Sequence, residues 1–198
     1  MSKFTQRTVS PFRFDVVGSF LRPQELKEAR SQYASGKITR EQLTAVEDKC
    51  IIDLIHKEEK AGLHAITDGE FRRSWWHLDF IWGFNGVEKC QAAEGYTFHD
   101  EVTRAETARI CGKLDGHNHP FVQHFKFVQS HISKGFQAKQ TMPAPCQAFL
   151  EFQRPENLEY LKKFYPSAEA LIPDFIAAYQ QVIRDLYDAG CRIVQFDE

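Results

Sequence analysis

Two short segments of this sequence end in carboxylates directly after an apolar run. Residues 61–70 finish in Asp-Gly-Glu with Glu70 last, and residues 191–198 finish with Asp197 and one further Glu. A pair of carboxylates at neighbouring strand ends can bind an ammonium group, hold a metal ion or share a proton. Each acid taken alone is equally compatible with a solvated loop or a helix N-cap. Glu70 and Asp197 are therefore the first candidates for ligand-binding residues.

Three further groups of residues could carry chemistry. Gly18 and Ser19 offer backbone N–H groups and a hydroxyl that suit a carboxylate or a phosphate, although a simple strand-to-loop break is the commoner reason for such a pair. Residues 117–119, His-Asn-His, suggest a metal, but no third ligand is near in sequence, which favours a solvated turn. Residues 75–77, Trp-Trp-His, could wall a pocket for a flat heterocycle or simply pack their loop. No catalytic residue and no metal ligand is assigned within the chain.

Parallel α/β units are predicted to position the two acidic segments. Each segment follows an amphipathic helix that ends in Ala-Gly, and a Gly past a helix followed by a short strand is typical of such units. The helix before Glu70 begins with a capping-box pattern at Thr39 and Gln42. Further helices are predicted after Pro23, at 155–164 and from Pro173. Core strands are predicted near 14–18, 64–67, 136–141 and 192–196.

The segment between the second and third predicted strands lacks a helical period. Residues 107–114 alternate between apolar and polar side chains, and Asp115-Gly116 follows as a turn signal, whereas residues 121–129 alternate less cleanly. A β-hairpin insertion at about 91–131 is predicted, because a structureless loop of this length is unusual inside a compact domain. The element order predicts an α/β fold. It fits the first four strands of a (β/α)8 TIM barrel, or one side of an open sheet.

Bulk composition excludes several classes of protein. The 198 residues carry a formal net charge of −2 and no basic run, so nucleic acid is not an expected partner. No apolar run approaches the ~20 residues of a membrane span, so no membrane partner is expected. Five cysteines without a C-x-x-C pair, and no signal peptide, predict reduced thiols in the cytoplasm. The length is short for a closed eight-stranded barrel, which needs roughly 250 residues.

Three motifs together resemble a known family. Val-Gly-Ser-Phe at 17–20, Thr-Asp-Gly-Glu-Phe-Arg-Arg at 67–73 and Gln-Phe-Asp-Glu at 195–198 are similar, in order and spacing, to the catalytic barrel of cobalamin-independent methionine synthase. More closely, the chain resembles short single-barrel homologues often labelled 5-methyltetrahydropteroyltriglutamate–homocysteine methyltransferase. The similarity spans nearly the whole chain, and the strand-end motifs are specific in combination.

This resemblance implies roles for four residues. Gly18 and Ser19 match the loop that holds the homocysteine carboxylate, and Glu70 and Asp197 match the acids that bind its amino group. In that family a zinc ion takes the homocysteine sulfur as a thiolate, which then attacks the N5-methyl of 5-methyltetrahydrofolate. The family's zinc ligands, a His-x-Cys pair, a Glu and a further Cys, follow the Asp-Glu strand. They are therefore expected outside this chain.

Residues 1–198 are accordingly predicted to be the N-terminal half of a methionine-synthase-like methyltransferase barrel, with homocysteine and methylfolate as substrates. The half-barrel alone is expected to be inactive. One alternative is a related barrel enzyme that acts on another thiol or another one-carbon donor. A second alternative is a non-catalytic half-barrel that self-associates through its open sheet edges.

Overall fold

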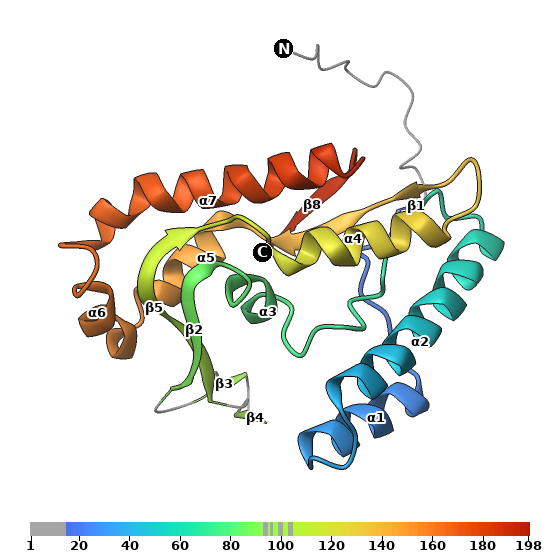
Figure 1. Cartoon of the computed structure of the whole chain (residues 1–198), viewed down its shortest axis with the longest axis horizontal. Coiled ribbons are helices and arrows are strands. Elements are labelled where there is room, and N and C mark those ends of the chain that lie inside the picture. Colours follow the sequence, from blue (N-terminus) through green and yellow to red (C-terminus); the bar gives the residue numbers. More distant parts are fainter. Residues whose placement is uncertain (1–14, 93–94, 96, 99–100, 103–104) are drawn as a thin grey trace, which may run out of the picture. The chain divides into compact units, whose positions relative to one another are not determined.

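The computed structural model of the chain describes residues 15–92, 95, 97–98, 101–102 and 105–198 (Figure 1). These residues form a mixed α/β chain that divides into two compact units. The first unit contains the described residues of Met1–Arg72 together with Phe127–Lys139. The second unit contains those of Arg73–Lys126 and Gln140–Glu198. Within the described ranges, no helix has the length and apolar character needed to cross a bilayer.

The first unit combines helices with one parallel strand pair. Its elements are α1 (Gln24–Ala34), α2 (Arg40–Lys60), β1 (Ala65–Ile66), β6 (Gln137–Ala138) and the end of α4 (Pro120–His131). β1 and β6 pair in parallel, and α1 packs against α2 (Figure 1). The predicted capping box is confirmed, because the Thr39 side chain accepts from the Gln42 N–H while the Gln42 side chain accepts from the Thr39 N–H. The buried face of α2 includes Leu43, Cys50, Ile51, Leu54 and Ile55.

The predicted first strand is wrong for residues 15–18, which are irregular in the structure; Phe14 lies outside the described residues. Side chains hold this segment in place of a backbone ladder. Lys139 Nζ donates to the Val16 carbonyl and, at 2.8 Å, to Asp15 Oδ1. The Thr67 hydroxyl donates to the Gly18 carbonyl at 2.8 Å. These contacts fix residues 15–18 through side chains from later parts of the chain.

The second unit is organised around one long strand, β5 (Glu106–Asp115), which the helices α3, α5, α6 and α7 all contact. β5 pairs antiparallel with β2, β3 pairs antiparallel with β4, and β7 pairs in parallel with β8. The remaining bounds are α3 (Leu78–Ile81), β2 (Asn85–Gln91), β3 (Thr97–Phe98), β4 (Glu101–Val102), β7 (Gln140–Pro143), α5 (Pro145–Phe152), α6 (Pro155–Leu161), α7 (Ala168–Asp188) and β8 (Val194–Asp197).

A β-hairpin is present, but its position differs from the predicted insertion at about 91–131. Its long strands pair from Asn85 with Asp115 to Gln91 with Glu106. Residues 121–129, predicted to alternate as a strand, instead belong to the helix α4. The buried side chains of that helix lie on one face, as the helical period requires: Phe121, Val122, Phe125 and Val128.

The later core strands follow the prediction in their pairing and depart from it in their bounds. The predicted strand 136–141 is split into β6 and β7, with Lys139 between them, and β7 pairs in parallel with β8 as expected. The helix predicted from Pro173 begins earlier, at Ala168, because the Ser167 side chain caps it by accepting from the Ala170 N–H. A proline in the second turn removes only one helical hydrogen bond, and a long buried stripe offsets that loss.

Gly116→Ala is expected to lower the free energy of unfolding by about 3 kcal/mol, because no space exists for a side chain. A Cβ on Gly116 would lie 2.1 Å from the carbonyl oxygen of Ala178 in α7, and a backbone atom of a packed helix cannot move aside cheaply. Urea unfolding monitored by circular dichroism measures the change. Gly112→Ala is the matched control, since its nearest contact would be 3.3 Å and its expected cost is much smaller. Equal costs for the two variants would contradict the packing argument.

Candidate functional site

The loop that follows β1 lies against residues 18–22 within the first unit. The Phe20 N–H donates to the Gly69 carbonyl at 3.2 Å, and Arg22 Nη2 donates to the Glu70 carbonyl at 3.0 Å. Three of the four sequence-predicted binding residues therefore lie in two adjoining loops. Gly18 is buried, whereas Ser19 is exposed.

The turn around Glu70 has an unusual backbone conformation. Gly69 and Glu70 both have left-handed backbones, with φ of 66° and 60°, and such a conformation costs a non-glycine residue roughly 1–2 kcal/mol. Asp68 Oδ1 accepts from the Glu70 N–H at 2.8 Å and so closes the turn. A Cβ on Gly69 would lie 2.3 Å from Leu54 Cδ2, so a larger residue there would have to displace that side chain. Glu70 is only 6% exposed. Strained backbone and a buried acid together are typical of ligand-binding sites.

A fully buried carboxylate anchors the residues that follow this turn. Glu47 in α2 accepts from Arg30 at 3.2 Å, from Arg40 at 3.2 Å and from Arg72 at 3.5 Å. Arg30 also donates to the Phe71 carbonyl. Burial raises the pKa of Glu47, and the three guanidinium groups act against that rise. The cluster connects α1, α2 and the chain after Glu70.

Asp197 belongs to the second unit, where it ends β8 beside the start of α5. Its carbonyl accepts from the Ala144 N–H at 2.8 Å, and its Oδ1 accepts from Gln195 Nε2 at 2.6 Å. The neighbouring Cys146 Sγ lies 3.4 Å from Glu198 Oε1. Acids at the carboxyl end of parallel strands occupy the edge at which α/β folds bind ligands.

Sequence reasoning missed three ionisable residues of the first unit: Glu47, Glu58 and Lys139, all of which are buried. Glu58 of α2 accepts from the Thr67 N–H at 3.3 Å, directly before the Asp-Gly-Glu turn. A signal was present, because Glu47 and Glu58 follow the same helical spacing as the buried apolar face of α2. Acids in a buried stripe indicate internal partners.

Zinc, which the family resemblance implies, does not fit the residues present. No group of three or more His, Cys, Asp or Glu in the described part of the chain could hold a metal ion. Of the two histidines considered above, His117 Nδ1 lies 2.5 Å from Asp115 Oδ1, and His119 is buried with its Nε2 at 2.9 Å from the Phe80 carbonyl. All five cysteines are free thiols.

The aromatic residues 75–77 are held by contacts within the second unit. The Trp75 indole N–H donates to Glu106 Oε2 at 2.5 Å, and the Trp76 ring lies 4.8 Å from the buried His77 ring. Both tryptophans are half-buried. These contacts favour the packing interpretation over an open aromatic pocket.

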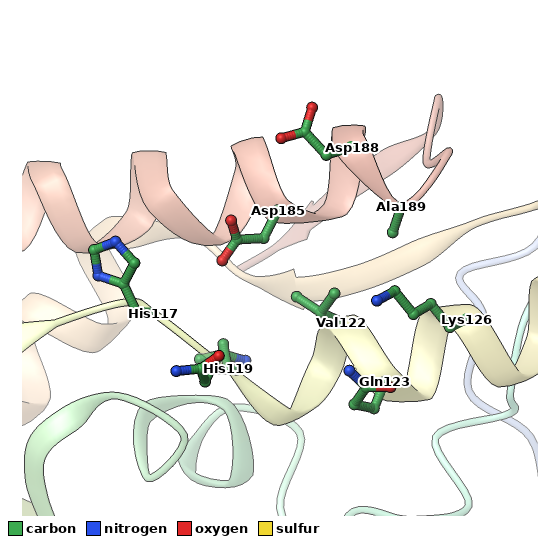
Figure 2. Close-up of a pocket in the computed structure, with 9 residues that line it drawn as sticks. His117, His119, Val122, Gln123, Lys126, Asp185, Asp188 and Ala189 are labelled. Carbon is green, nitrogen blue, oxygen red and sulfur yellow. The ribbon is translucent and has the colours of Figure 1, made fainter.

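A groove of about 610 Å³ runs between α4 and α7 in the second unit (Figure 2). Val122 and Lys126 of α4 and Asp185 and Asp188 of α7 lie on its two walls. Its charges are of both signs, and none of the four sequence-predicted binding residues lines it. The groove therefore adds nothing to the candidate site.

Acid is expected to destabilise the second unit through His119, which also borders that groove. Burial lowers the pKa of His119 to about 4 from an ordinary value of 6.5. The unfolded chain therefore takes up this proton first, and stability present above pH 6.5 is lost as the pH falls toward 4, by up to about 3 kcal/mol. Unfolding free energies measured across this range test the expectation. In His119→Gln the loss of unfolding free energy between pH 6.5 and pH 4 should be smaller. An unchanged dependence of the unfolding free energy on pH would assign the loss to other groups.

The described residues define an α/β chain in which the candidate acid Glu70 follows β1 and Asp197 ends β8, whereas Gly18 and Ser19 follow an irregular segment. Residues 12–198 match the family model described as cobalamin-independent synthase, catalytic domain, and the chain belongs to this family. It is 39% identical to YxjH of Bacillus subtilis, an uncharacterised protein, across 99% of this chain and 50% of that one. It is 27% identical to a methionine synthase of Saccharolobus solfataricus, across 92% of this chain and 51% of that one.

A solved structure is also similar. The putative vitamin-B12-independent methionine synthase of Listeria monocytogenes superposes with a TM-score of 0.75 and 37% identity, covering 96% of this chain and 53% of that one. The chain thus spans about half the length of the relatives it matches. The mixed α/β fold resembles half of a methionine synthase catalytic domain.

Proposed function

We propose that these residues supply the amino-acid-binding half of a methyltransferase barrel that transfers a methyl group from 5-methyltetrahydrofolate to the thiol of homocysteine. The observation that carries the proposal is the buried Glu70, held in a left-handed turn beside Gly18 and Ser19, in a chain of this family. In this proposal β1, β6 with β7, and β8 belong to the first four strand positions of the barrel.

The proposed roles are those that the family resemblance implies, and the chemistry of the side chains is compatible with them. Gly18 and Ser19 bind the carboxylate of the amino acid through backbone N–H groups and a hydroxyl. Glu70 and Asp197 bind its ammonium group, because charge-assisted hydrogen bonds are about twice as strong as neutral ones. The proposed compartment is the cytoplasm, and neither nucleic acid nor membrane is a proposed partner.

Zinc and the folate complete the proposed reaction from outside these residues. When bound, zinc would stabilise the sulfur of homocysteine as a thiolate at neutral pH. Its ligands are proposed to lie in the part of the family domain that this chain does not span. Residues 1–198 alone are then expected to bind the amino acid without transferring methyl groups.

Binding of L-homocysteine to the isotope-labelled chain tests the proposal. The amide resonances of Gly18, Ser19 and Glu70 are expected to shift with L-homocysteine and to shift far less with 4-mercaptobutanoate, which lacks the amino group. Equal shifts with both thiols would favour the alternative of a related enzyme with a different thiol substrate. A chimera that carries this chain in place of the matching half of Bacillus subtilis YxjH, assayed with zinc for methionine formation, tests the whole reaction.

Self-association of the isolated chain is expected from its exposed apolar side chains. Phe196 of β8 is 46% exposed, Leu150 of α5 is 62% exposed and Ile176 of α7 is 49% exposed. β8 pairs only with β7 among the described strands, and an open, weakly charged strand edge favours association. Sedimentation velocity at increasing concentration should show growing species, which Phe196→Lys should reduce. A stable monomer at all concentrations would contradict this expectation.

A further inference from the structure

A buried acid lies beneath the loops of the candidate site. Glu58 of α2 is 2% exposed, and both of its carboxyl oxygens lie 3.3 Å from the Thr67 nitrogen. Its Oε1 also lies 3.3 Å from the Thr67 hydroxyl oxygen. Thr67 is the last residue before the Asp-Gly-Glu turn. The position of Glu58 is therefore coupled to that turn through Thr67.

The protons available at Thr67 determine which groups can donate. Its hydroxyl carries one proton and lies 2.8 Å from the Gly18 carbonyl, which can only accept. The same hydroxyl oxygen accepts from the Gly69 N–H at 3.1 Å. When the Thr67 hydroxyl donates its hydrogen bond to the Gly18 carbonyl, it has no proton left for Glu58. The contact between the Thr67 hydroxyl oxygen and Glu58 is then favourable only if the Glu58 carboxyl group is protonated and donates. The geometry therefore matches a neutral carboxylic acid at Glu58.

The surrounding charges agree with that protonation state. Burial is the largest influence and raises the pKa of Glu58 to about 8. The carboxylate of Asp68 adds to the rise, whereas the hydrogen bond from the Thr67 N–H and the ammonium of Lys139 oppose it. Lys139 itself is paired with Asp15 at 2.8 Å, which reduces its influence on Glu58.

We propose that Glu58 is a positioning residue that acts as a neutral acid and, through the Thr67 hydroxyl, fixes the backbone of the Gly18–Ser19 loop. When Glu58 loses its proton, its carboxylate lies beside the Thr67 hydroxyl, whose only proton is donated to the Gly18 carbonyl. The hydroxyl then turns toward Glu58, and the Gly18 carbonyl loses its donor. The identity of the ligand rests on the proposed function, in which this loop binds the carboxylate of an amino acid. Its affinity for that carboxylate falls as the pH rises.

Amide resonances of the labelled chain, followed from pH 6 to pH 9.5, test the coupling without any ligand. The signals of Gly18, Ser19 and Gly69 are expected to move together, with a midpoint near the Glu58 pKa of about 8. Glu58→Gln should hold them at their low-pH positions, Thr67→Val should abolish the common movement, and Thr67→Ser should retain it. Independent movement of the three signals, or a Glu58→Gln variant that titrates like the original chain, overturns the proposal. The titration of the unaltered chain is decisive even if a variant does not fold.

Binding of L-methionine at pH 7 and pH 9 links the coupling to the ligand. The affinity of the unaltered chain relative to Glu58→Gln is expected to fall about fivefold between the two pH values, which is the value of one ordinary hydrogen bond. Because both proteins meet the same ligand, titration of the methionine amino group cancels in this ratio. A constant ratio overturns the link between Glu58 and binding. Failure of L-methionine to bind at either pH, with the amide titration intact, rejects the proposed function and leaves Glu58 as the positioning residue of the loop.

Discussion

Glu47→Gln is expected to lower the free energy of unfolding by about 3–5 kcal/mol, as removal of one partner from a buried ionic cluster usually does. The carboxylate of Glu47 is fully buried and faces the guanidinium groups of Arg30, Arg40 and Arg72. The amide of Gln has nearly the same shape but no charge, so those guanidinium groups would lose the carboxylate that they share. Urea unfolding followed by circular dichroism measures the cost.

The chain offers a matched control for this substitution. Glu25 on α1 pairs with Lys49 on α2 at 2.8 Å, but both side chains are more than half exposed. Glu25→Gln should therefore cost less than about 1 kcal/mol. Hydrogen exchange adds a local readout, because the amides after Glu70 should exchange faster in Glu47→Gln alone. Similar losses of unfolding free energy in Glu47→Gln and Glu25→Gln would mean that burial does not strengthen the ionic cluster around Glu47.

Local sequence signals predicted some elements well and failed for others. The start of α2 was predictable because the capping box involves only Thr39 and Gln42, three positions apart. The helix α4 was missed because Phe125 and Phe127 imitate the alternation of a strand. In the structure Phe127 is only half-buried. Its ring centroid lies 4.3 Å from that of His131, and the Arg72 guanidinium lies 4.8 Å from the centroid of the Phe127 ring. The contact with Arg72 joins distant parts of the chain and leaves no local pattern in the sequence.

The same distinction applies to the candidate site. The acids at strand ends were predictable because a short apolar run followed by acidic residues is a local pattern, as at Glu70. The irregular segment before Gly18 was not predictable from local patterns, because its conformation depends on Lys139, more than one hundred positions later in the chain. The burial of Glu58 likewise depends on how α2 lies against β1. Sequence reasoning therefore identified residues proposed to contact a ligand, and it missed residues that position them.

Glu70→Gln is expected to weaken binding of L-homocysteine by about 100-fold, because loss of one partner from a buried charge pair costs about 3 kcal/mol. Gln preserves the length of the side chain, and the backbone N–H of residue 70 can still donate to Asp68, so the left-handed turn should persist. The substitution removes the negative charge that is proposed to bind the ammonium group. Amide-shift titrations of the chain with L-homocysteine measure the affinity.

Removal of the ligand's amino group gives the matched control for this substitution. With 4-mercaptobutanoate, the original chain and Glu70→Gln should bind equally weakly, so the two changes together should cost little more than either alone. Such non-additivity is the signature of a direct contact between Glu70 and the amino group. If Glu70→Gln weakens both ligands by the same factor, Glu70 instead acts by holding the turn. The ammonium would then have to be bound by another acid, and Asp197 would be the first to replace.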